Sequence, residues 1–211
     1  MKYFEKKSGF FQSKKCQQFL FLAIFSLYFI FLFLDFFKQA FTISNWIKWG
    51  CIWLIAILQT TYRQTPMAWR LAAWLTVFCD YSLLFNFGIP LGLICFCLVH
   101  LLRIYTLEKK YLNICLQVSL FFLIIGLIFK IFFWGILLDY TFLLFFTAFL
   151  IKRKENKRLI WGYFLFIACD FCVLLANFPI NSTVNAAILS WLFYLPSQFL
   201  LVTDKKTKIS F

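Results

Sequence analysis

Charged residues are scarce in this chain. They make up 14% of its 211 residues, whereas hydrophobic residues make up 64% and the mean hydropathy is +0.86. Soluble domains carry about 25% charged residues, so this composition excludes an ordinary water-soluble fold. Phenylalanine alone contributes 32 residues, more than the core of an aqueous protein of this size would hold. The composition therefore predicts a membrane protein.

Glycine, proline and histidine are also rare, with 7, 4 and 1 residues. Few glycines or prolines are therefore present to interrupt helices inside a membrane. The sequence contains no HExxH zinc motif, no glycine-rich phosphate loop and no GxSxG nucleophile motif. We expect neither a metal nor an organic cofactor, and we expect no separate soluble catalytic domain.

Apolar residues form eight stretches separated by short polar breaks. Each stretch is close to the roughly 20 residues that a helix needs to cross a bilayer. We predict one integral membrane domain over residues 1–211, an all-α polytopic bundle of eight transmembrane helices. The predicted spans are 18–37, 46–62, 68–87, 88–107, 112–129, 131–151, 159–178 and 186–203.

The formal net charge is +13, and most of the Lys and Arg residues that produce it lie in the predicted loops and tails. If the N-terminus is cytoplasmic, 18 of the 21 Lys and Arg residues fall on the cytoplasmic side, and Lys38, Lys48 and Lys130 fall on the other. The positive-inside rule states that cytoplasmic loops carry an excess of Lys and Arg. The observed excess therefore fits an even number of spans with both termini in the cytoplasm. We expect a multi-pass protein of the cell membrane that is in contact with the lipid bilayer and does not bind nucleic acid.

The lysine-rich N-terminus, followed by an apolar run, has two interpretations: a signal peptide or a first span. The run from residue 19 to 37 is long for a signal peptide, and no small-residue cleavage site follows it. We therefore interpret it as the first span.

The eight cysteines lie mostly within the apolar stretches. This placement does not form a disulfide framework. Cys169 and Cys172 make a CxxC pair, a spacing that can bind metal or perform redox chemistry. Because no second pair is present and the chain has one histidine, we interpret the cysteines as small packing residues.

An internal repeat relates the third and seventh stretches. Residues 78–84, FCDYSLL, match residues 168–175, ACDFCVLL, and Asn86-Phe87 and Asn177-Phe178 follow the two copies. Asp170 follows Asp80 by 90 residues, the length of four spans, so both copies cross the membrane in the same direction. We expect a 4+4 arrangement with an axis along the membrane normal.

Asp80 and Asp170 lie well inside their predicted spans, near mid-membrane. A carboxylate at this depth costs several kcal/mol unless it is paired, hydrated or protonated, so it is a candidate functional residue. The alternative is a protonated aspartate that only forms hydrogen bonds between helices. Their matched positions in the repeat favour function, and we predict that both are catalytic and face one cavity between the two halves.

Five further polar residues are candidates for binding a substrate: Lys48, His100, Tyr140, Tyr194 and Gln198. Tyr194 and Gln198 are four residues apart and share a helix face. Structural alternatives exist for most of them. His100 and the Tyr194–Gln198 pair are equally compatible with polar packing between helices, and Lys48 with snorkelling to the interface.

The motifs around the two aspartates resemble those of the YhhN-type lysoplasmalogenases, which are eight-span membrane enzymes. The first motif is the Asp80 segment followed by Gly92 and by Phe96-x-x-x-His100. The second is residues 162–170, continuing to residues 175–178 and to Tyr194-x-x-x-Gln198. The resemblance covers nearly the whole chain in the number, order and spacing of the spans.

The chain departs from the family pattern at several positions. Cys79 stands where the family usually has Gly, Cys169 where it usually has Ser, and Arg103 where a Tyr often follows the His. No Lys-Pro opens the second span, although Lys48 lies near that place.

The resemblance implies hydrolysis of the vinyl ether bond of a lysoplasmalogen to a fatty aldehyde and a glycerophosphoalcohol. This reaction needs one proton donor and one base near a water molecule, and two neighbouring carboxyl groups can divide these roles. Lys48 is the nearest candidate cation for the phosphate of the lysophospholipid substrate. A proton-coupled transporter that uses the same aspartates is the alternative, and a non-catalytic membrane scaffold is a third possibility.

Overall fold

The computed structural model describes residues 14–37, 41–62, 65–85, 87–177 and 186–202. Lys38, Asn86, Phe178 and both termini lie outside the described residues. Within the described part every regular element is helical. The elements are α1 (Lys14–Phe36), α2 (Phe41–Thr61), α3 (Met67–Leu84), α4 (Ile89–Leu107), the 3-10 helix η2 (Lys109–Tyr111), α5 (Leu112–Ile128), α6 (Phe132–Arg153), α7 (Lys157–Asn177) and α8 (Ala186–Val202).

Several helices match the requirements of a bilayer. Five segments are long and apolar enough to cross a membrane: Lys15–Phe36, Ile89–Leu107, Lys109–Ile128, Phe132–Arg153 and Lys157–Ala176. α8 contains a shorter apolar segment, Ile188–Val202. By length and composition, the chain is a multi-pass helical membrane protein. Eight complete spans and cytoplasmic termini remain predictions.

The helix ends lie near the limits of the predicted apolar stretches, with two informative differences. α2 begins at Phe41, earlier than the predicted residue 46, because its backbone helix continues through polar residues that precede the apolar run. α3 ends at Leu84, before the predicted residue 87, and Gly88 turns the chain into α4 with a φ of 130° that favours glycine. Asp80 is therefore only one turn from the end of α3, nearer that end of the bundle than expected.

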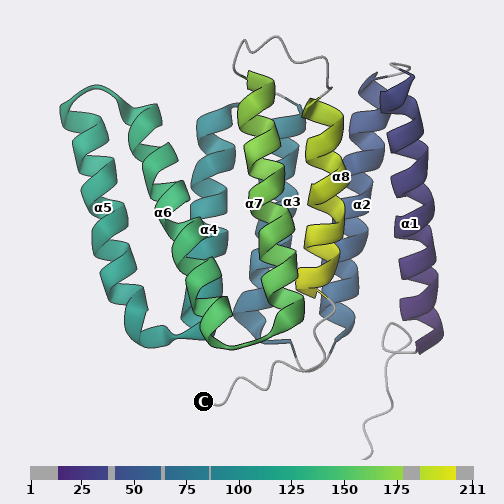
Figure 1. Ribbon diagram of the computed structural model, residues 1–211, viewed down its shortest axis with the longest axis horizontal. Coiled ribbons are helices and arrows are strands. Elements are labelled where there is room, and N and C mark those ends of the chain that lie inside the picture. Colours follow the sequence, from purple (N-terminus) through teal and green to yellow (C-terminus); the bar gives the residue numbers. More distant parts are fainter. Residues whose placement is uncertain (1–13, 38–40, 63–64, 86, 178–185, 203–211) are drawn as a thin grey trace, which may run out of the picture.

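The helices alternate in direction along the chain (Figure 1). One end of the bundle carries the start of α1, the connections α4–α5 and α6–α7, and the end of α8. We call it the basic end, because most described Lys and Arg residues lie there, including Lys109, Lys110 and the run from Lys152 to Arg158. The opposite end carries the α5–α6 turn with Lys130.

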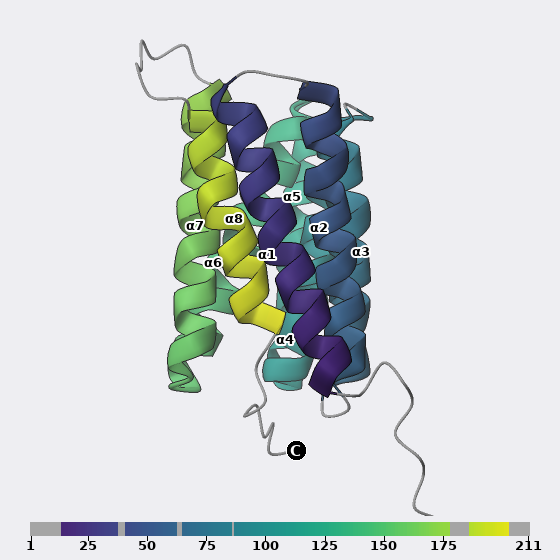
Figure 2. The same ribbon diagram turned by 90° about the vertical axis from the view of Figure 1, so that its right-hand side faces the viewer.

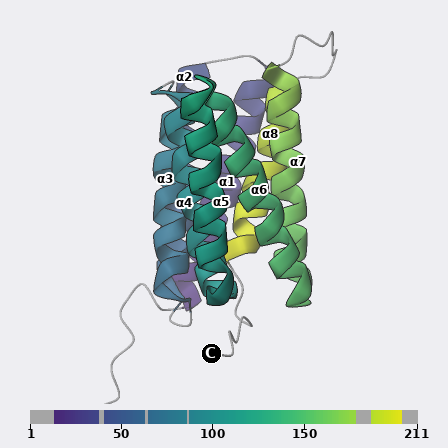
Figure 3. The same cartoon turned by 90° about the vertical axis from the view of Figure 1, so that its left-hand side faces the viewer.

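The contacts between helices follow the 4+4 pattern of the sequence. α3 packs most extensively on α4, and α7 packs most extensively on α8. α4 also contacts α6, just as α8 contacts α2, and the outer pairs α1–α2 and α5–α6 complete the two halves. α1 and α8 lie side by side on one face of the bundle (Figure 2), and α5 and α6 on the other (Figure 3). Corresponding helices therefore have corresponding neighbours.

Small residues allow close approach within these pairs. A Cβ atom on Gly135 of α6 would lie 2.7 Å from the backbone oxygen of Phe122 in α5. A Cβ atom on Gly92 of α4 would lie 2.8 Å from the Leu83 side chain of α3. Glycine at such positions lets helices approach closely in a membrane, where packing rather than water drives their association.

The outer faces of the bundle are apolar. α1 and α5 are the least buried of the candidate spans and carry many exposed aromatic and aliphatic side chains. Examples are Phe19, Leu22, Phe29, Phe33, Leu120, Phe121, Leu127 and Ile128. These faces suit contact with lipid tails, and the polar residues of the spans are concentrated in the interior.

Candidate functional site

Asp80 is buried in the interior of the bundle, with 4% of its surface exposed. It lies on α3, and Tyr194 of α8 donates its hydroxyl to the carboxylate, 2.8 Å from one oxygen and 2.7 Å from the other. Tyr194 is itself 5% exposed, so it faces the bundle and not the lipid. The hydrogen bond joins the first copy of the repeat to the last helix of the second half.

Asp170 has an equivalent arrangement on α7. The hydroxyl of Tyr140, on α6, donates to its Oδ2 atom at 2.5 Å. Asp170 and Asp80 are close enough to interact electrostatically, and Cys169 is near both carboxyl groups. Each predicted catalytic aspartate is therefore hydrogen-bonded by a tyrosine that the sequence analysis places among the candidate binding residues.

Aromatic rings connect the two tyrosine–aspartate pairs. The ring centroid of Phe166 lies 5.8 Å from that of Tyr194 and 6.0 Å from that of His100. The His100 ring in turn lies 5.6 Å from the Tyr140 ring. We call this group the aspartate cluster: Asp80, Tyr140, His100, Phe166, Asp170 and Tyr194. It brings together α3, α4, α6, α7 and α8.

His100 and Gln198 are both buried, with exposures of 0% and 4%. The Nδ1 atom of His100 lies 3.4 Å from the hydroxyl of Tyr163. Neither His100 Nε2 nor Gln198 Nε2 has a hydrogen-bond partner among the described residues. A buried polar atom without a partner is costly, so both nitrogens are available to a ligand group.

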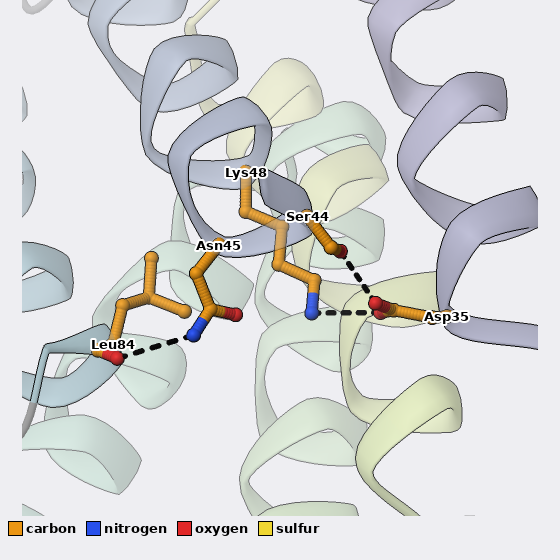
Figure 4. A network of polar contacts seen from close by, with 5 residues as sticks. All are labelled: Asp35, Ser44, Asn45, Lys48 and Leu84. Atoms are coloured by element: carbon orange, nitrogen blue, oxygen red, sulfur yellow. Dashed lines mark hydrogen bonds and ion pairs between the residues drawn. The ribbon is translucent and has the colours of Figure 1, made fainter. Parts of the chain in front are cut away.

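Lys48 does not extend to the membrane interface. It is 4% exposed, and its Nζ atom forms an ion pair with Asp35 Oδ2 of α1 at 2.7 Å. Figure 4 shows Lys48 and Ser44 of α2 pointing at the Asp35 carboxylate, with Ser44 hydrogen-bonded to its other oxygen. Asn45 points away from this group and donates to the Leu84 carbonyl at 3.3 Å (Figure 4).

The snorkelling interpretation of Lys48 is therefore wrong, because a buried carboxylate holds its ammonium group inside the bundle. Lys48 still lies near the aspartate cluster, since its Nζ atom is 5.4 Å from the Trp191 ring centroid and that ring is 5.1 Å from the Tyr194 ring. Its role toward a lipid phosphate remains a prediction, now with Asp35 as a competing partner.

Two buried charged residues lie outside the predicted site. Asp139 of α6 is 3% exposed and contacts Cys97 of α4 and Ser119 of α5. Arg103 of α4 is 3% exposed and donates to the Tyr163 hydroxyl at 3.1 Å. The only sequence signal for Arg103 is a strong base one turn beyond His100 in an apolar stretch.

All eight cysteines are free thiols, six of them buried. Cys169 and Cys172 are both among the buried ones, as the packing interpretation expects. Within the described part of the chain, no group of three or more His, Cys, Asp or Glu side chains is arranged to hold a metal ion.

Comparison with known proteins finds no family model, no curated protein and no solved structure that matches this chain. Two carboxyl groups and two phenol hydroxyls in an interior shielded from water can hold, donate and accept protons.

Proposed function

We propose that this protein is a membrane-embedded hydrolase that cleaves the vinyl ether bond of lysoplasmalogens. The products are a fatty aldehyde and a glycerophosphoalcohol, such as glycerophosphoethanolamine or glycerophosphocholine. The observation that carries the proposal is a pair of aspartates inside the bundle, Asp80, which is buried, and Asp170, which is partly buried. Each is hydrogen-bonded by a tyrosine, and both belong to one cluster. The specific reaction is inferred from the resemblance of their motifs to those of the YhhN-type lysoplasmalogenases.

The chemistry requires an acid and a base. A carboxylic acid transfers its proton to the β-carbon of the vinyl ether, and the double bond becomes an oxocarbenium ion. A water molecule then adds to this ion, and the second carboxylate accepts a proton from that water. The product of this step is a hemiacetal. The hemiacetal then collapses to the aldehyde and the alcohol. Glycosidases use two carboxyl groups around a similar cationic transition state, and Asp80 and Asp170 supply such a pair here.

The location suits a substrate with a single hydrocarbon chain. Such a lipid can enter between helices from the bilayer, with its chain against the Phe and Leu side chains and its polar end toward the head groups. The rest of the aspartate cluster surrounds the reacting bond with aromatic rings. This environment limits water to the molecule that is consumed in the reaction.

The decisive experiment measures aldehyde release by purified protein in detergent from a 1-alkenyl lysophospholipid. The saturated 1-alkyl analogue is the control, because it has no double bond to protonate and must remain intact. Release of aldehyde from the alkenyl lipid alone is the expected result. No release from well-folded wild-type protein would refute the proposal.

A proton-coupled transporter is the second candidate, and the matched neighbours of the two halves favour it. Paired carboxyl groups inside a membrane can also carry protons. A transporter moves its solute only across a sealed membrane and responds to a pH gradient. Solute uptake into sealed vesicles without any turnover in detergent would place this candidate first.

A further inference from the structure

Arg103 is a buried cation beside the aspartate cluster. It lies on α4 one turn from His100 and is 3% exposed. Its guanidinium donates to the Tyr163 hydroxyl at 3.1 Å and lies 5.6 Å from the Trp69 ring and 5.5 Å from the Tyr163 ring. Two aromatic side chains, Trp69 and Tyr163, therefore lie against this charge, and Tyr163 also accepts a hydrogen bond from it.

No carboxylate of the described residues lies within ion-pair distance of Arg103. The other buried cation, Lys48, is neutralised by Asp35 at 2.7 Å. Cation–π contacts offset only part of the cost of removing a guanidinium from water. Arginine does not lose its proton inside proteins, so the charge at Arg103 persists and favours an anion.

Unpartnered buried donors are present on α4 and on α8. Arg103 Nε, His100 Nε2 and Gln198 Nε2 are all buried without a hydrogen-bond partner among the described residues. Gln198 is on α8 between Tyr194, which binds Asp80, and Leu201, whose carbonyl accepts a bond from Trp69 Nε1 at 3.3 Å. These donors come from two helices that pack on the aspartate helices, α3 and α7.

We infer that Arg103 is the anchor of a phosphate-binding site, assisted by the free donors of His100 and Gln198. A guanidinium is planar and presents paired N–H groups that match two phosphate oxygens. The group bound is a phosphate ester or free phosphate. The site lies on the side of the aspartate cluster toward the basic end, opposite to the end where Lys48 lies.

The spacing suits a lysophospholipid, and this step rests on the proposed function. Tyr163, which contacts Arg103, precedes Asp170 on α7 by seven residues, a rise of about 10 Å in a helix. In a lysoplasmalogen, seven bonds separate the phosphorus from the β-carbon, about 8 Å in an extended chain. A phosphate on Arg103 therefore places the reacting carbon at the level of Asp170.

The test is a binding measurement by titration calorimetry with full-length protein in detergent. The probes are a 1-alkyl lysophosphoethanolamine, which the proposed reaction cannot cleave, the matching 1-alkylglycerol without phosphate, and inorganic phosphate. We expect the phosphate-bearing lipid to bind at least tenfold more tightly than the alkylglycerol. Binding of inorganic phosphate that depends on Arg103 would assign the site to free phosphate rather than to a lipid head group.

Arg103→Gln should weaken binding of the phosphate-bearing probe by about 10- to 100-fold, the usual loss for a hydrogen bond to a charged group, and leave alkylglycerol binding unchanged. Arg103→Lys keeps the charge but not the paired N–H groups, so its loss should be smaller. Lys152→Gln is the control for one lost positive charge, since Lys152 is exposed at the basic end. Size-exclusion profiles and melting temperatures establish that each variant is folded.

Equal affinity of the wild type and both folded Arg103 variants for the phosphate-bearing probe would overturn the site. Equal affinity of the wild type for the two lipid probes would do the same. The hydrolase proposal fails separately: Arg103-dependent binding without aldehyde release keeps the phosphate site and rejects the reaction. Aldehyde release with a Michaelis constant that is indifferent to Arg103 keeps the reaction and rejects the site.

Discussion

The two central aspartates share one local pattern, a carboxyl group held by a tyrosine from a neighbouring helix. Tyr194 contacts both oxygens of Asp80, and Tyr140 contacts one oxygen of Asp170. A phenol that donates to a carboxylate fixes its orientation and leaves part of its hydrogen-bonding capacity open. The orientation of each carboxyl group is therefore held by a residue of a neighbouring helix.

Replacing either aspartate should abolish most of the activity. Asp80→Asn and Asp170→Asn keep the size of the side chain but can neither donate the proton nor act as a base. Each should reduce aldehyde release by about 10²- to 10⁴-fold, the usual effect of losing an acid or base. In the proposed mechanism the two groups act as one unit, so the double variant should be little worse than the worse single variant. Asp139→Asn is the matched control, a buried aspartate outside the cluster, and an equal loss there would argue against a specific role.

The tyrosines should act through their aspartates. Tyr194→Phe removes one charge-assisted hydrogen bond of about 1.5–3 kcal/mol and should reduce the rate by roughly 10- to 100-fold. In an Asp80→Asn background the same change should have a much smaller effect, which a double-mutant cycle measures. Additive losses would mean that Tyr194 acts independently of Asp80.

Lys48 and Asp35 show what a single sequence cannot reveal. The spacing of apolar residues predicts where helices lie, but not which faces of two helices meet, so the partner of Lys48 required the packed bundle. We expect Lys48→Met alone to destabilise the protein by about 3–5 kcal/mol, because it leaves Asp35 buried without its cation. Lys48→Met combined with Asp35→Leu should recover most of this loss in a thermal melt. If the Michaelis constant of the double variant is unchanged, Lys48 does not contribute to substrate binding.

At the scale of helices, the sequence predicts the elements well and their contacts less well. The apolar stretches anticipate α4, α5 and α7 to within two residues or so, because lipid requires continuous apolar faces. The aspartates and tyrosines of the cluster were also recognisable as polar residues in apolar surroundings. The sequence does not predict two other contacts, that of Arg103 with Tyr163 and that of Asp139 with Cys97. Both depend on how α4 packs against α7 and α6.

The α5–α6 pair should depend on its glycines. Gly135→Ala would place a methyl group 2.7 Å from a backbone oxygen of α5, and backbone cannot move aside as a flexible side chain can. Overpacking of this kind costs about 1–3 kcal/mol, which should appear as a lower melting temperature. Gly50→Ala in α2 is the control, because its Cβ would meet nothing within 4 Å. There the better helix propensity of alanine should leave stability equal or slightly higher.

At the scale of the whole molecule, the distribution of charge predicts the orientation in the membrane. Lys130 lies at the α5–α6 turn, and Lys154 follows α6 at the basic end. Translocating lysine and arginine across a membrane is unfavourable, so the basic end should face the cytoplasm. In intact cells, a membrane-impermeant maleimide should label Lys130→Cys but not Lys154→Cys, and in inverted vesicles the pattern should reverse. Both positions are exposed, so differences in burial do not account for the result. Labelling of Lys154→Cys in intact cells would show the opposite orientation. The Arg103 phosphate site would then lie on the side of the outer leaflet.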